Sequence, residues 1–83
     1  TTALAAGDTG MDVVVPMLAQ ARDYLTDDGI LVVEVGYSKP ALEALFPEVP
    51  FFWVDFEFGG DGVFVLTANQ LETYQADFER VNI

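Results

Sequence analysis

Apolar and polar residues follow one another with spacings that predict a helix, a strand, a helix, two antiparallel strands and a final helix. Val14 and Leu18 recur at helical spacing in the first segment, and we expect a helix over about 12–26. Pro16 has no backbone N–H to donate and is tolerated in about the first turn of a helix, so this helix has to begin near Asp12.

The next segment, ILVVEVG at 30–36, is apolar almost throughout. An unbroken apolar run of this length predicts a strand covered on both faces, which is typical of a central, parallel strand. After it, Ser38 is placed to cap a short second helix that has Pro40 in its first turn. Leu42 and Phe46 give this helix an apolar face.

Strict alternation marks the strand predicted over 51–58, which we expect at an edge of the sheet. One face carries Phe52, Val54, Phe56 and Phe58, and the other carries Trp53, Asp55 and Glu57. We expect the face of Phe52 to pack in the core. The Gly-Gly-Asp-Gly segment at 59–62 predicts a tight turn, and the strand at 63–67 returns antiparallel as the second half of a hairpin.

The final helix is predicted over about 68–80. Thr67 followed three residues later by Gln70 is a capping box, in which each residue satisfies a backbone N–H of the other at the start of the helix. Leu71, Tyr74 and Phe78 lie on one side of this helix.

The composition limits the chemistry that the chain can perform. Fourteen acidic and three basic residues give a formal net charge of −11, which repels the phosphates of nucleic acids. Cysteine and histidine are absent, which removes thiolate and imidazole metal ligands and the nucleophile systems that need them. The apolar runs are far shorter than the ~20 residues that span a bilayer. We expect no metal, no nucleic acid, no membrane partner and a cytoplasmic location.

Two architectures accommodate these elements. One is a small regulatory or protein-interaction module with a ferredoxin-like sheet. The other is the end of a doubly wound α/β sheet whose last strand runs antiparallel. The periodicity alone does not separate the two.

Three blocks of sequence favour the second architecture. They are LAAGDTGMD at 4–12, ARDYLTDDGILVVEVG at 21–36 and PEVPFFWVDFEFGGDGVFVLT at 47–67. In this order and spacing they resemble the end of the PrmB branch of the HemK-type methyltransferases. The resemblance implies the C-terminal part of a Rossmann-like α/β fold that uses S-adenosylmethionine to methylate a glutamine side-chain amide of a ribosomal protein. Residues 1–83 would then be a single partial domain, the C-terminal half of the catalytic domain.

The resemblance also implies what this chain lacks. The family's glycine-rich cofactor loop and its Asn-Pro-Pro-Tyr motif do not occur in this sequence. We therefore expect no catalytic residue and no bound S-adenosylmethionine in this chain, which would be inactive alone. In the family's sheet, 30–36 is the fifth strand, 51–58 the sixth and 63–67 the seventh, which lies between the other two. Without a fourth strand the edge of 30–36 is unpaired, and we expect self-association through this edge or through exposed apolar helix faces.

Ligands of open α/β sheets bind beyond the carboxyl ends of the parallel strands. The candidates on that substrate side are Glu34, Gly36, Gly59, Gly60, Asp61 and Gly62. Glu34 is either a functional carboxylate or one that pairs with the backbone or a hydroxyl group, and the other candidates shape either a substrate loop or only a turn. Exposure at the sheet edge explains Asp55 and Glu57, and Trp53 remains a candidate for contact with a partner.

Overall fold

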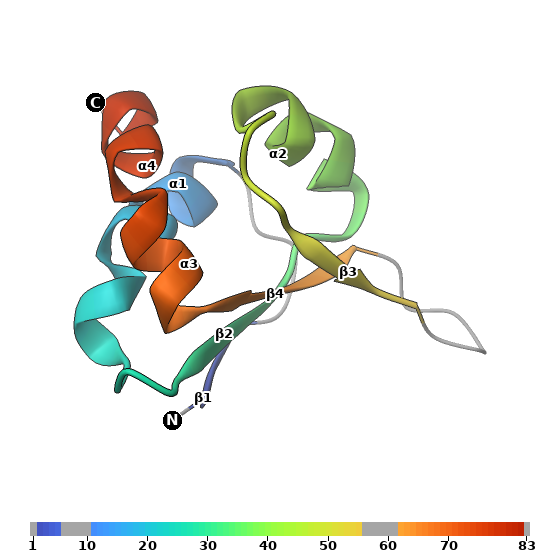
Figure 1. Ribbon diagram of the computed structural model, residues 1–83. Helices are drawn as coiled ribbons and strands as arrows, with labels where there is room; N and C mark the ends of the chain where they lie inside the picture. The colour runs from blue at the N-terminus through green and yellow to red at the C-terminus, as the bar shows by residue number, and fades with distance from the viewer. Residues whose placement is uncertain (1, 6–10, 56–61, 83) are drawn as a thin grey trace.

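A computed structural model describes residues 2–5, 11–55 and 62–82 of the chain, and it shows a small α/β structure (Figure 1). The elements in these residues are β1 (Thr2–Ala5), α1 (Met11–Gln20), the 3₁₀ turn η1 (Ala21–Tyr24), β2 (Ile30–Glu34), the 3₁₀ turn η2 (Gly36–Ser38), α2 (Lys39–Leu45), β3 (Phe52–Val54), β4 (Val63–Thr67), α3 (Ala68–Thr73) and α4 (Gln75–Val81). The predicted order from the first helix to the last is confirmed.

The four described strands form one sheet in the order β1-β2-β4-β3. β1 and β2 are parallel neighbours, whereas β4 runs antiparallel to both β2 and β3. The second strand of the hairpin therefore lies between the two strands that precede it, as predicted. A ferredoxin-like sheet is antiparallel throughout, so the parallel pair β1–β2 argues against that alternative.

The prediction of an unpaired edge along 30–36 is wrong. The described strand β1 occupies this edge, in a register that pairs Thr2 with Ile30 and Ala5 with Val33. The hydrogen bonds of a β-ladder come from backbone groups, so a short segment without strong strand propensity satisfies them when the edge is available. This leaves no free edge on β2.

The sheet is covered on one face. In β2, Leu31 and Val33 are buried, whereas Ile30, Val32 and Glu34 are only partly buried. β4 shows the same alternation, with Phe64 and Leu66 buried between partly exposed neighbours. The expectation that 30–36 is covered on both faces is therefore wrong for the described chain. An apolar run indicates side chains suited to burial, but which layers are present is decided by the other elements.

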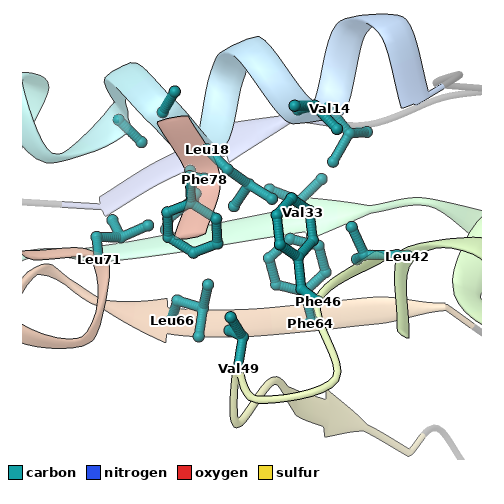
Figure 2. Packing of buried hydrophobic residues seen from close by; sticks show 14 of the residues in the cluster. Val14, Leu18, Val33, Leu42, Phe46, Val49, Phe64, Leu66, Leu71 and Phe78 are labelled. Carbon is teal, nitrogen blue, oxygen red and sulfur yellow. The ribbon is translucent and has the colours of Figure 1, made fainter. Parts of the chain in front are cut away.

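All four α-helices contribute to the layer on the covered face, and in Figure 1 they lie above the sheet. Figure 2 shows their buried side chains meeting those of β2 and β4: Val14 and Leu18 from α1, Leu42 from α2, Leu71 from α3 and Phe78 from α4. Phe46, which follows α2, stacks edge-on against Phe78 with ring centroids 5.2 Å apart. Among the described residues no polar or charged side chain is buried, so the core is held by apolar packing.

The two faces of β3 are the reverse of the prediction. Trp53 is directly opposite the fully buried Phe64 of β4, and their rings pack edge-on with centroids 5.5 Å apart. Phe52 points to the other face and is 66% exposed. Alternation separates two faces, but the register with β4 decides which of them meets the core. Phe56, Glu57 and Phe58 lie outside the described residues.

The first helix differs from the prediction in its end and in the place of Pro16. α1 stops at Gln20 and continues as the 3₁₀ turn η1 rather than as an α-helix to about 26. Pro16 is the sixth residue of α1 and lies beyond the first turn. Proline at this position removes one helical N–H donor, a cost that the burial of neighbouring residues such as Leu18 offsets.

The later helices confirm one predicted cap and correct another. Thr67 and Gln70 form the predicted capping box, with Gln70 N–H donating to Thr67 Oγ1 at 3.1 Å and Thr67 N–H donating to Gln70 Oε1 at 3.0 Å. Ser38 precedes α2 but makes no side-chain capping bond. The predicted last helix is two helices, because the backbone of Tyr74 leaves the helical conformation between α3 and α4.

Candidate functional site

Two of the predicted substrate-side residues meet where β2 ends and β4 begins. Gly36 and Gly62 both have a positive φ, +55° and +76°. The Val35 N–H donates a 2.7 Å hydrogen bond to the Gly62 carbonyl, which extends the β2–β4 pairing by one step. A Cβ atom on Gly62 would lie 2.5 Å from the Gly36 oxygen and 2.7 Å from its nitrogen, whereas a Cβ on Gly36 would meet nothing within 4 Å. Gly62 is therefore required by close backbone packing as well as by its dihedral angle.

Glu34 lies near this glycine contact but on a different surface. It is opposite Val63 in the β2–β4 register, and the alternation along β2 puts it on the partly exposed face with Ile30 and Val32. The other predicted substrate-side residues, Gly59, Gly60 and Asp61, lie outside the described residues. The structure thus brings Gly36 and Gly62 into contact and places Glu34 at the adjoining strand end.

The glycine contact directs the chain from strand to helix. From Gly36 the backbone enters η2 and then α2, and Tyr37 stands on this turn with its side chain fully exposed. The contact itself is made by backbone atoms and supplies no acid, base or nucleophile. Its contribution is structural, because it fixes the backbone conformation where β2 ends and η2 begins.

Arg22 forms a charged cluster that sequence patterns did not indicate. Its guanidinium contacts Asp27 Oδ1 at 2.7 Å and Glu72 Oε1 at 3.2 Å, and it donates to the Leu25 carbonyl at 3.0 Å. The hydrogen bond to Asp27, with further attraction from Glu72, raises the pKa of Arg22 above its ordinary value, and burial opposes this only in part. The cluster ties the turn η1 to α3. Asp27 is exposed and paired with Arg22.

A second unpredicted feature lies between α2 and β3. The ammonium group of Lys39 is 4.8 Å from the centroid of the Trp53 ring, a cation–π contact between the single lysine and the single tryptophan of the chain. Beside them is a groove of about 180 Å³. Its apolar lining consists of Phe46, Pro47, Val49, Pro50, Phe51 and Trp53, and Glu43 supplies its charged group. We call this the α2–β3 groove.

The described part of the chain lacks two further features. No helix there is long and apolar enough to cross a membrane. No three acidic side chains in residues 2–5, 11–55 and 62–82 converge so that they could hold a metal ion.

Known proteins are similar in sequence to this chain over almost its whole length. The ribosomal protein uL3 glutamine methyltransferase of Francisella tularensis subsp. tularensis is 44% identical over 78 residues, which are 94% of this chain and 25% of that protein. The protein of the same name from Xanthomonas campestris pv. campestris is 42% identical over 73 residues, which are 88% of this chain and 24% of that protein. No protein-family model matches the chain, and no solved structure matches it.

These matches relate the chain to the protein methyltransferases. Within that class it is a relative of the ribosomal protein uL3 glutamine methyltransferases, which confirms the resemblance recognised in the sequence. The chain spans about a quarter of the length of these relatives.

Proposed function

We propose that this chain is the C-terminal part of an S-adenosylmethionine-dependent methyltransferase that methylates a glutamine side-chain amide of a ribosomal protein. The observation that carries the proposal is the 44% identity over 94% of the chain to a relative named for that reaction. A ribosomal-protein substrate also fits the cytoplasmic location expected from the sequence. Because the chain corresponds to about a quarter of such a protein, the activity depends on the remainder.

One face of the sheet is not covered by the described helices, which supports the proposal that the chain is part of a larger α/β domain. We define the open face by the side chains that alternate with the core in three strands: Ile30, Val32 and Glu34 of β2, Val63, Val65 and Thr67 of β4, and Phe52 and Val54 of β3. All but Glu34 and Thr67 of these side chains are apolar, and none is buried in the described chain. Apolar surface left in water forgoes about 25 cal/mol for each Å². We propose that helices from the remainder of the protein cover the open face, as in doubly wound sheets.

The proposal also assigns cofactor binding to the remainder. The family's glycine-rich cofactor loop and its Asn-Pro-Pro-Tyr motif do not occur in this sequence. We propose that the chain contributes one end of the sheet and part of a substrate-side rim, and that by itself it transfers no methyl group.

Self-association of the isolated chain is proposed through the open face, since β1 already pairs with the edge of β2. Val32→Lys would place a charge in the middle of that face and should lower the associated fraction in light scattering. Val13→Lys is the matched control, because Val13 is 53% exposed on α1 and belongs to the helical side. If Val13→Lys lowers association and Val32→Lys does not, the helix face is the contact and the open face is not.

The proposed function is tested with the longer reading frame that contains this chain. The full-length protein should transfer a labelled methyl group from S-adenosylmethionine to purified uL3, and a uL3 variant with its acceptor glutamine replaced should remain unlabelled. The 83-residue chain alone should label neither protein and should give no heat on calorimetric titration with S-adenosylmethionine. Absence of uL3 labelling by the full-length protein would refute the substrate assignment, and micromolar cofactor binding by the isolated chain would refute the division of roles.

A further inference from the structure

The α2–β3 groove combines an apolar floor with acidic surroundings. Aromatic and proline side chains dominate its lining, and its volume of about 180 Å³ is enough for one aliphatic side chain. It is lined by residues of α2, of β3 and of the segment that joins them. Grooves lined by aromatic side chains recur as binding sites for extended peptides.

The charges around the groove specify the kind of segment that fits it. Glu43 belongs to the lining, and the exposed Glu48 and Asp55 lie on the segments that form or leave the groove. The basic group beside it, Lys39, already lies against the Trp53 ring. An acidic segment would therefore be repelled, whereas a lysine or arginine next to the inserted side chain would meet Glu43.

The contact between Lys39 and Trp53 places one positive charge beside the groove. The Trp53 ring lies against an ammonium group at 4.8 Å, so the electron-rich face of this ring is positioned to attract a positive charge. A cation from a partner would compete with Lys39 for this position or be repelled by it. Removing the lysine charge should consequently strengthen binding of a basic segment, the opposite of the effect of removing the charge of Glu43.

We infer that the α2–β3 groove binds a segment of a partner protein in which an aliphatic side chain is flanked by lysine or arginine. The inference goes beyond the proposed methyl transfer and does not depend on it. The groove is formed entirely by residues of this chain, so binding needs no cofactor and is measured on the 83-residue chain. A failure of methyl transfer by the full-length protein would leave it standing.

Trp53 is the single tryptophan of the chain, and its emission therefore reports directly on occupation of the groove. The probe is a short capped peptide with a central leucine between lysines and glycine elsewhere. We expect a saturable change in Trp53 emission with a Kd on the order of 0.1–1 mM, as suits one inserted side chain. A peptide with glycine in place of leucine, and a peptide with glutamates in place of the lysines, should each bind at least about fivefold more weakly.

Variants of the protein separate the charge effects from folding. Glu43→Gln should weaken binding of the leucine–lysine peptide about two- to fivefold, and Lys39→Met should strengthen it by a similar factor. Glu79→Gln is the matched control, because Glu79 is exposed on α4 and does not line the groove. It changes the net charge by the same amount as Glu43→Gln and should leave the affinity unchanged. Far-ultraviolet circular dichroism identifies any variant that fails to fold. If a variant does not fold, the comparison of the three peptides on the unmodified chain still tests the inference.

Several results would overturn the inference. Equal binding of the leucine and glycine peptides would show that the groove is not occupied, and equal binding of the acidic peptide would show that charge plays no part. Equal effects of Glu43→Gln and Glu79→Gln would mean that only the overall negative charge attracts the peptide. A change of Trp53 emission with protein concentration, without any peptide, would assign the groove to a second copy of this chain.

Discussion

The contact between Gly36 and Gly62 predicts an unequal response to the same substitution at two neighbouring glycines. Gly62→Ala adds a Cβ atom 2.5–2.8 Å from three backbone atoms of Gly36, whereas Gly36→Ala adds one in open space. Both residues have positive φ, so an alanine at either position suffers left-handed strain. The difference between the two variants therefore isolates the backbone contact.

The expected magnitudes follow from the geometry. Left-handed strain costs an alanine about 1–2 kcal/mol, and the smaller entropy of the unfolded alanine chain returns about 0.4–1 kcal/mol, so Gly36→Ala should cost about 1 kcal/mol. In Gly62→Ala the new Cβ must move about 1 Å further from the Gly36 backbone to reach ordinary contact at 3.5–4.0 Å. Such overpacking costs about 1–3 kcal/mol, and stretching the 2.7 Å bond from Val35 N–H to the Gly62 carbonyl adds about 0.5–1.5 kcal/mol. We expect a total of about 3–5 kcal/mol for Gly62→Ala.

The assay is urea unfolding of the 83-residue chain and of both variants, followed by circular dichroism, with thermal unfolding as a second measure. A loss of 1 kcal/mol lowers the Tm of a domain this small by about 4–8 °C, so the two variants should be well separated. If Gly62→Ala is unfolded in buffer, its midpoint can be compared with that of Gly36→Ala in a stabilising osmolyte such as TMAO. Equal losses of about 1 kcal/mol for both variants would refute the backbone contact and leave only the dihedral strain.

Three further predictions concern the core, a helix cap and the charged cluster. Phe64→Ala should cost about 3–5 kcal/mol, because Phe64 is fully buried between two aromatic rings. Phe52→Ala in the same urea series should stay within about 0.5 kcal/mol, since that side chain is 66% exposed. Thr67→Ala should cost about 1 kcal/mol of stability through loss of the capping box. Thr73→Ala removes an exposed hydroxyl that is bonded within its own helix, and it should have a smaller effect in thermal unfolding. Arg22→Met should lower the Tm at low salt and lower it less at high salt, because salt screens ion pairs. If the decrease in Tm is the same at both salt concentrations, packing of the Arg22 side chain, and not its ion pairs, holds η1 to α3.

Local signals accounted for most of the elements. The capping box of Thr67 and Gln70, the two strands of the hairpin and the start of α2 around Pro40 were all predicted from neighbouring residues. These features depend on hydrogen bonds and dihedral angles within a few residues, so a short stretch of sequence contains the information. The predicted family resemblance likewise depended on blocks of sequence, and the relatives confirm it.

The candidate site was predicted in part. Glycines at 36 and 62 were placed at the substrate side from strand order, but their mutual contact joins residues that are 26 positions apart in the chain. The Arg22 cluster and the contact of Lys39 with Trp53 also join different elements. The scarcity of basic residues, three against fourteen acidic ones, is the signal that could have drawn attention to both contacts, although it does not identify the partner residues.

The sequence by itself determined where most helices and strands form, although not β1, and which residues are suited to burial, because propensity, capping and periodicity are local properties. The tertiary structure decided which face of each element is used. Trp53 packs inward and Phe52 outward because of the register with Phe64, and β1 pairs with β2 because its backbone groups fit the available edge. Strand β2 shows this division most clearly. Its apolar residues are suited to burial on both faces of the sheet, but the described helices cover only one face.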